Sequence, residues 1–201
     1  MSAVITSITG LQNLNNLNNF NADYNGLQSV NLSGLANLLY VDISDNDIPG
    51  TGTSSLTSVN LSGCTALEEL RLDDSDFSAG VPDLSGLTSL VWFDMDQCNI
   101  SGSLDLQGLS SLEGFDLNSN IGITNVTISS SQPLGDGFEV LLNNNDLTQT
   151  AVDDILVALA ANSINNGYVQ LDGGTNAAPG ATGLAAITTL TGKGWSYDVN
   201  S

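Results

Sequence analysis

Carboxylates are the most abundant side chains that could take part in catalysis or metal binding in this 201-residue sequence. It has 22 Asp and Glu residues, only two residues that are Lys or Arg, and no His. Neighbouring carboxylates can bind calcium through oxygen atoms, or serve as the acid and the nucleophile of a glycoside hydrolase. The lack of His excludes imidazole-dependent triads, and Cys64 and Cys98 alone cannot build the usual kinds of zinc site. A formal charge of −20 argues against DNA, RNA and anionic membranes as partners.

Composition also bounds the class of protein. The length and a hydrophobic content of 41% indicate one folded module with a sizeable core. No apolar run approaches the roughly 18 residues of a membrane helix, so we expect no membrane insertion. Residues 1–7 lack the basic start and apolar stretch of a signal peptide. We expect both cysteines to be buried structural thiols rather than nucleophiles.

A repeated pattern must position the carboxylates. Its frame is apolar, any, apolar, any, any, then Asn or a small polar residue. The frame starts at Phe20, Val41, Leu70, Phe93, Phe115 and Val140, with a weaker copy at Val169. The alternating apolar pair predicts a short strand with one buried face. We expect the Asn amide to bond the turn backbone of its own and the adjacent coil, with Ser75 and Cys98 as weaker substitutes.

This pattern resembles the leucine-rich repeat family (L-x-x-L-x-L-x-x-N) over roughly residues 10–147. The resemblance implies an α/β fold, mostly β: a solenoid over residues 1–147 with a parallel sheet on one face. A second alternating motif predicts short strands on the opposite wall. It occupies residues 29–33, 58–62, 103–107 and 125–129, and residues 49–55 read as a surface loop.

Residues 148–201 depart from the repeat and predict a C-terminal αβ cap continuous with the solenoid. Thr150 is the expected N-cap of a first helix with Asp153 at its third position. That helix has an apolar stripe of Val152, Ile155, Leu156 and Leu159, and residues 165–167 are expected to stop it. A strand at 168–172, a second helix around Leu184, Ile187 and Leu190, and a last strand at 195–199 complete the cap. This ending resembles the closing segment of repeat proteins from phages and environmental bacteria.

We call the solvent side of the expected parallel sheet the strand face. Strands about 4.8 Å apart align equivalent residues in columns. Arg71 then lies between Asp42 and Asp94, which predicts an ion triad that either balances charge or anchors an acidic ligand group. Tyr40 and Trp92 either stack against a ligand or fill gaps over neighbouring strands. The candidate partner-binding residues are Tyr24, Tyr40, Asp42, Glu69, Arg71, Trp92, Asp94 and Asp116.

A second set of carboxylates suggests a cation site. The pairs Asp73/Asp96 and Asp45/Asp74 lie on neighbouring strands with no cationic side chain beside them, and opposed like charges destabilise a sheet. These four aspartates are the candidate calcium ligands, with solvated carboxylates as the alternative. No Asp-x-Asp-x-Asp-Gly loop is present. No other metal or cofactor is expected.

These features favour a non-enzymatic recognition module that binds a protein or glycan on a cell surface through the strand face. We expect no catalysis, because a wide regular sheet offers no pocket to raise a carboxyl pKa. The resemblance to phage and bacterial repeat proteins suggests a virion-associated or extracellular adhesin. The alternative is a structural or decoration protein of a virion or cell surface that assembles through its edges.

Overall fold

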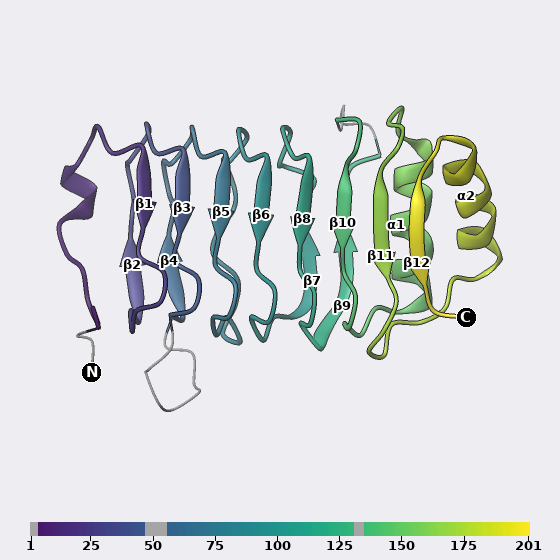
Figure 1. The fold of residues 1–201 in the computed structure, drawn as a ribbon, viewed down its shortest axis with the longest axis horizontal. Coiled ribbons are helices and arrows are strands. Elements are labelled where there is room, and N and C mark those ends of the chain that lie inside the picture. Colours follow the sequence, from purple (N-terminus) through teal and green to yellow (C-terminus); the bar gives the residue numbers. More distant parts are fainter. Residues whose placement is uncertain (1–3, 47–55, 131–134) are drawn as a thin grey trace.

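The computed structural model describes residues 4–46, 56–130 and 135–201, so the surface loop expected at 49–55 lies outside the described residues. The chain is an α/β protein made mostly of strands. One large parallel sheet runs along its long axis, and two helices lie at its C-terminal end (Figure 1).

The large sheet has eight strands, in the order β1-β3-β5-β6-β8-β10-β11-β12, and every neighbouring pair is parallel. Its strands are β1 (Asn19–Asn21), β3 (Tyr40–Asp42), β5 (Glu69–Arg71), β6 (Trp92–Asp94), β8 (Gly114–Asp116), β10 (Glu139–Leu141), β11 (Tyr168–Leu171) and β12 (Ser196–Val199). Each repeat frame therefore forms a strand, as predicted. The first apolar residue of each frame is buried, as Val41 and Phe93 are, because alternate side chains of a strand point to opposite faces.

Two small parallel sheets accompany the large one. They pair β2 (Ser29–Asn31) with β4 (Ser58–Asn60), and β7 (Ser101–Asp105) with β9 (Gly122–Thr127). All four segments of the second motif thus contain a strand, although β7 and β9 begin two and three residues before the expected starts at 103 and 125. Their buried side chains, such as Val30 and Leu104, join the same core as those of the large sheet, so the core lies between the large and the small sheets.

Buried asparagine amides connect successive coils of the chain. The Asn46 Nδ2 atom donates to the backbone oxygens of Ala22 (3.0 Å) and Ile43 (2.9 Å), while its Oδ1 accepts from Leu27 N–H (2.9 Å). Asn120 and Asn145 make equivalent bonds to their own and the preceding coil, which confirms the role expected for this position. In the weaker copy of the frame, which starts at Val169, the equivalent bonds come from Asn176 rather than from Gly174, the residue at the asparagine position of the frame.

The N-terminal residues include a short 3-10 helix, η1 (Leu11–Asn13), and the C-terminal region has the helices α1 (Gln149–Ala161) and α2 (Ala181–Gly192). The predicted N-cap at Thr150 is wrong: Thr148 caps α1, because its side chain accepts the Ala151 N–H at 3.2 Å. Asp153 instead accepts the backbone N–H of Gly180, the residue before α2, at 2.8 Å.

Both helices contribute buried side chains to the core. The stripe of Val152, Ile155, Leu156 and Leu159 is buried as predicted, but α1 ends at Ala161, before residues 165–167. In α2, Ile187 and Leu190 are buried while Leu184 is exposed. α1 contacts α2 on one side and β9 on another. Within the ranges that the structure describes, neither helix has the length and apolar character needed to cross a bilayer.

Candidate functional site

The strand face has the register that the repeat frame predicts. Asp42, Arg71 and Asp94 are aligned partners on β3, β5 and β6, and Asp116 follows on β8. A second column aligns Tyr40, Glu69 and Trp92 with Gly114. All eight candidate partner-binding residues therefore lie on this face or, for Tyr24, just after β1.

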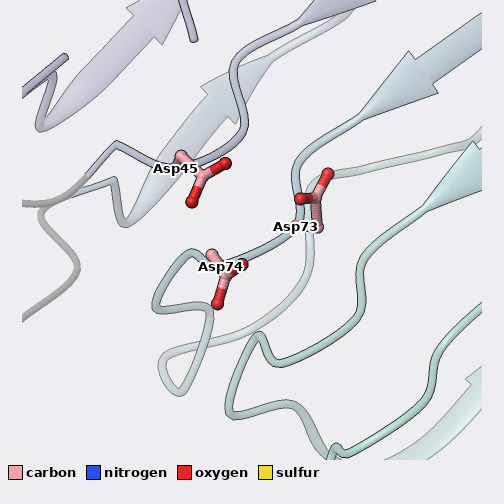
Figure 2. Close-up of side chains that lie close together, drawn as sticks. All are labelled: Asp45, Asp73 and Asp74. Carbon is pink, nitrogen blue, oxygen red and sulfur yellow. The ribbon is translucent and has the colours of Figure 1, made fainter. Parts of the chain in front are cut away.

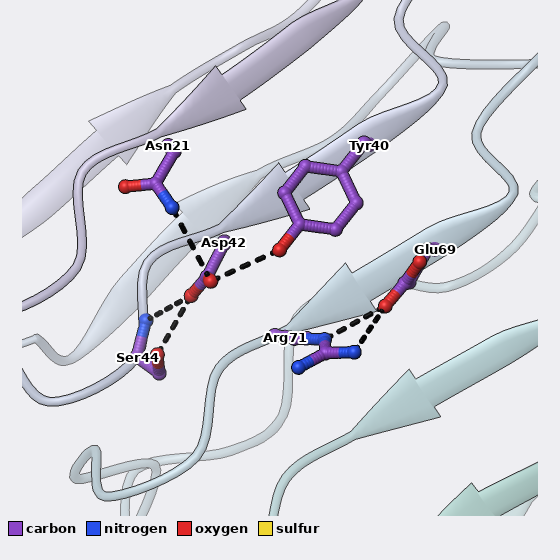
Figure 3. A network of polar contacts seen from close by, with 6 residues as sticks. All are labelled: Asn21, Tyr40, Asp42, Ser44, Glu69 and Arg71. Carbon is purple, nitrogen blue, oxygen red and sulfur yellow. Dashed lines mark hydrogen bonds and ion pairs between the residues drawn. The ribbon is translucent and has the colours of Figure 1, made fainter.

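Asp42 is held by neutral donors at the centre of a local network (Figure 3). Its Oδ2 accepts from the Tyr40 hydroxyl at 3.0 Å and from Asn21 Nδ2 at 3.4 Å, and its Oδ1 accepts from the Ser44 hydroxyl at 2.6 Å. The side chain is only 8% exposed, so these bonds replace water around the carboxylate. Burial, together with the hydrogen bond from Tyr40 to Asp42, raises the pKa of the tyrosine.

Arg71 does not form the predicted triad with Asp42 and Asp94. Its guanidinium pairs instead with Glu69, two residues earlier on β5, at 2.6 Å from Nη2 and 2.7 Å from Nε to the same Oε1 (Figure 3). Residues two apart share one face of a strand, so Glu69 is within reach without crossing to a neighbour. Asp42 already has the donors that its carboxylate needs. Arg71 with Glu69 is the one ion pair among the described residues.

The aromatic residues of the strand face differ in their surroundings. A Cβ atom added at Gly114 would lie 2.5 Å from the Trp92 ring, so the indole covers the glycine of the neighbouring strand. This is the gap-filling arrangement, and it leaves Trp92 partly exposed. Tyr24 is 74% exposed, and its pKa is raised by a hydrogen bond to Asp45. Tyr24 is thus the most exposed of these three rings, while Tyr40 and Trp92 are both partly exposed.

A row of half-buried carboxylates occupies the middle of the strand face. Burial, followed by the negative charges of Asp94 and Asp96, raises the pKa of Asp73 to about 7. Burial and neighbouring carboxylates also raise the pKa values of Asp94 and Asp116 to about 6 each. Arg71, which is paired with Glu69, lowers the pKa of Asp94, but burial outweighs this effect. The row therefore carries repulsion that the chain itself does not neutralise.

Three of the four candidate calcium ligands come together. Carboxylate oxygens of Asp45, Asp73 and Asp74 lie within 4.8 Å of one another, and all three residues are partly exposed (Figure 2). Asp96 is not part of this group within the described ranges. Three carboxylates at this spacing could supply oxygen ligands to a calcium ion, and acidic groups at protein surfaces are also common without a bound ion. Calcium binding stays a prediction.

The turn after each strand has a conformation that the frame alone does not predict. In the first six repeat frames, the residue at the fifth position of the frame has a φ of +51° to +58°, in the left-handed region; these residues are Tyr24, Asp45, Asp74, Gln97, Ser119 and Asn144. Asp and Asn tolerate this region, and their recurrence at this position was the available signal. The turn brings Asp45 and Asp74 beside Asp73 and exposes Tyr24.

The two cysteines are free, and both are buried as expected. Their Sγ atoms donate to backbone oxygens, Cys64 to Leu32 at 3.2 Å and Cys98 to Leu72 at 3.1 Å. Burial raises the pKa of both thiols, so neither is activated as a nucleophile.

Comparison of the chain with protein-family models and with curated proteins found no match.

Proposed function

We propose that the chain is a solenoid of the leucine-rich repeat type and that it acts as a non-enzymatic recognition module. The repeat frame, its regular parallel strands and the asparagine bonds between coils support the solenoid. The strand face binds a protein or glycan partner on a cell surface. We place this activity on a phage virion or outside a bacterial cell, on the resemblance of the repeat and of the C-terminal cap.

The observation that carries this proposal is the set of exposed aromatic surfaces among aligned carboxylates. Tyr24 offers an exposed ring and Trp92 a partly exposed one, while the Arg71–Glu69 pair offers polar groups between them; the buried Asp42 holds Tyr40 in place rather than facing the partner. Rings beside ordered polar groups suit either sugar stacking or a protein hot spot. The net charge of −20 favours neutral or basic partners over acidic ones.

Binding of the labelled protein to a glycan array and to a panel of bacterial cells tests this function. We expect Tyr24→Ser combined with Trp92→Ser to abolish the binding that the unchanged protein shows. Tyr197→Ser is the matched control, since this exposed tyrosine aligns with the inward-pointing Val169 rather than with the strand face. Equal binding by the double variant and the control would refute the assignment of the strand face.

A structural or decoration role is the second candidate function, and the open edges of the large sheet favour it. β1 and β12 each have a single neighbour among the described strands, and three of the four β12 residues are exposed. Unpaired edges are templates for association with another chain. Light scattering after size-exclusion chromatography separates the two functions, because edge assembly predicts concentration-dependent oligomers and no affinity for cells or glycans.

A further inference from the structure

The small sheets leave a gap between β4 and β7, behind the part of the large sheet that contains β5 and β6 (Figure 1). Residues 76–87 pass through this gap without forming a strand. Pro82 has no N–H to contribute to a ladder, and Gly80 has a φ of +131°, outside the range of a strand. No backbone hydrogen bond within the described ranges joins residues 78–86 to β7.

The edge of β7 that faces this gap is therefore open. β7 has β9 as its one neighbour in the described sheet, and β9 is in turn contacted by α1. Four of the five β7 residues are exposed, and Leu104 is buried. A bulge interrupts the β7 ladder between Gly102 and Ser103, and Gly102 has a φ of +82°, so the regular part of this edge, residues 103–105, is the part that presents backbone N–H and C=O groups to an added strand.

A groove follows this open edge along its whole length. It consists of two adjoining hollows of about 440 and 280 Å³, which share Val81, Ser103 and Leu104 in their walls. Residues 77–85 form one side of the groove and residues 100–106 the other. Val81 is 37% exposed, so the groove offers an apolar surface beside the free strand edge.

Carboxylates give the groove its charge. Asp83 and Asp105 both line the larger hollow, and both are exposed. Each is oriented by a backbone N–H two residues later: Asp83 Oδ1 accepts from Ser85 at 2.9 Å and Asp105 Oδ1 from Gln107 at 3.0 Å. The Ser85 bonds lower the pKa of Asp83, which keeps it ionised. Neither aspartate has a cationic partner among the described residues.

We propose that the open edge of β7 is a second binding site, which takes an extended basic peptide segment of a partner protein. The segment adds as a strand beside β7, places an apolar side chain against Val81 and Leu104, and sets a Lys or Arg against Asp83 and Asp105. An edge strand supplies main-chain affinity, the groove supplies side-chain selectivity, and the paired aspartates select for positive charge. The site lies across the core from the strand face and does not depend on the function proposed for that face.

A labelled, capped heptapeptide with lysine at both ends and alternating valine and threonine between them is the probe. We expect saturable binding by fluorescence anisotropy, which is lost when alternate backbone nitrogens of the peptide are methylated. Asp83→Asn with Asp105→Asn should weaken binding at least fivefold at low ionic strength. Asp136→Asn is the control and should leave it unchanged, because this exposed carboxylate bonds the backbone of Asn165 elsewhere on the molecule.

Hydrogen exchange locates the bound peptide independently of the variants. We expect slower amide exchange in residues 101–105 and unchanged exchange in β5 and β6. Equal affinity for the methylated peptide, equal affinity of the double variant, or protection confined to the strand face would each overturn the proposal. Protection of residues 101–105 that rises with protein concentration in the absence of peptide would also overturn it, since a second copy of the chain would then be the occupant.

Discussion

The charge of Asp73 should destabilise the folded protein at neutral pH. Its pKa rises from 3.8 to about 7 on folding, so the folded state binds more protons than the unfolded state between about pH 4 and pH 7. Stability linked to this group therefore falls as the pH rises through that window. A full shift of this size corresponds to roughly 4 kcal/mol, but solvent screening of this half-buried group reduces the expected effect to about 1–2 kcal/mol.

Substitution of Asp73 by Asn tests this reasoning, because asparagine has nearly the same shape and carries no charge. We expect Asp73→Asn to raise the free energy of unfolding by about 1–2 kcal/mol at pH 8 and to change it little at pH 4.5, where the carboxyl of the folded protein is already neutral. Urea denaturation at both pH values, in the presence of a chelator, measures the difference. The fluorescence of Trp92 and Trp195 reports unfolding.

Asp76→Asn is the matched control in the same coil. Hydrogen bonds from Ser78 lower the pKa of Asp76, so this substitution should destabilise the protein at pH 8, opposite in sign to Asp73→Asn. The reasoning is refuted if Asp73→Asn has the same effect at pH 4.5 and pH 8, or if it destabilises the protein at pH 8.

Three other predictions concern stability. Asn120→Ala removes, from a fully buried site, hydrogen bonds to the backbone of Met95, Leu117, Cys98 and Ile100. Calorimetry should show that the free energy of unfolding falls by about 3–4 kcal/mol. The control Asn37→Ala, at an exposed site, should lower it by less than about 1 kcal/mol. Gln97 has a φ of +52°, which asparagine adopts with less strain, so Gln97→Asn should raise the free energy of unfolding by about 0.5–1 kcal/mol in urea denaturation. A lower free energy of unfolding would show that the hydrogen bond from Gln97 to Asp96 matters more. If the three clustered aspartates bind calcium, calcium should raise the Tm more than sodium does at matched ionic strength. The free energy of unfolding should increase by about 2.7 kcal/mol when calcium is in hundredfold excess over its Kd. Equal Tm shifts with the two salts would mean that the ions act by screening alone.

Periodicity accounts for the elements that the sequence could predict. The frame starting at Val41 or Phe93 fixes which residues are buried, which residues align and where each strand lies, because a one-residue shift would expose every apolar side chain. The amide at Asn120 was predictable for the same reason, as its position in the coil determines the backbone groups within its reach. Strand positions and columns on the strand face therefore follow from sequence.

Choices between equivalent partners could not be predicted. Arg71 had acidic neighbours on both adjacent strands, yet it pairs with Glu69 on its own strand because Tyr40, Asn21 and Ser44 already satisfy Asp42. Trp92 covers Gly114 because the glycine leaves space, which only the aligned register reveals. The N-cap at Thr148 rather than Thr150 depends on the exact start of α1, and two threonines two residues apart offer the same local signal.

The weak asparagine positions have a mechanical consequence. At Ser75 the side chain reaches a single backbone oxygen, that of Asp73, at 3.5 Å, and at Cys98 a thiol replaces the amide, whereas Asn46 and Asn120 clamp the coils on either side. The same stretch of chain contains residues 76–87, where the small sheets are interrupted. With fewer side-chain bonds between coils there, we expect a load applied along the long axis to bend or open the molecule at this stretch first.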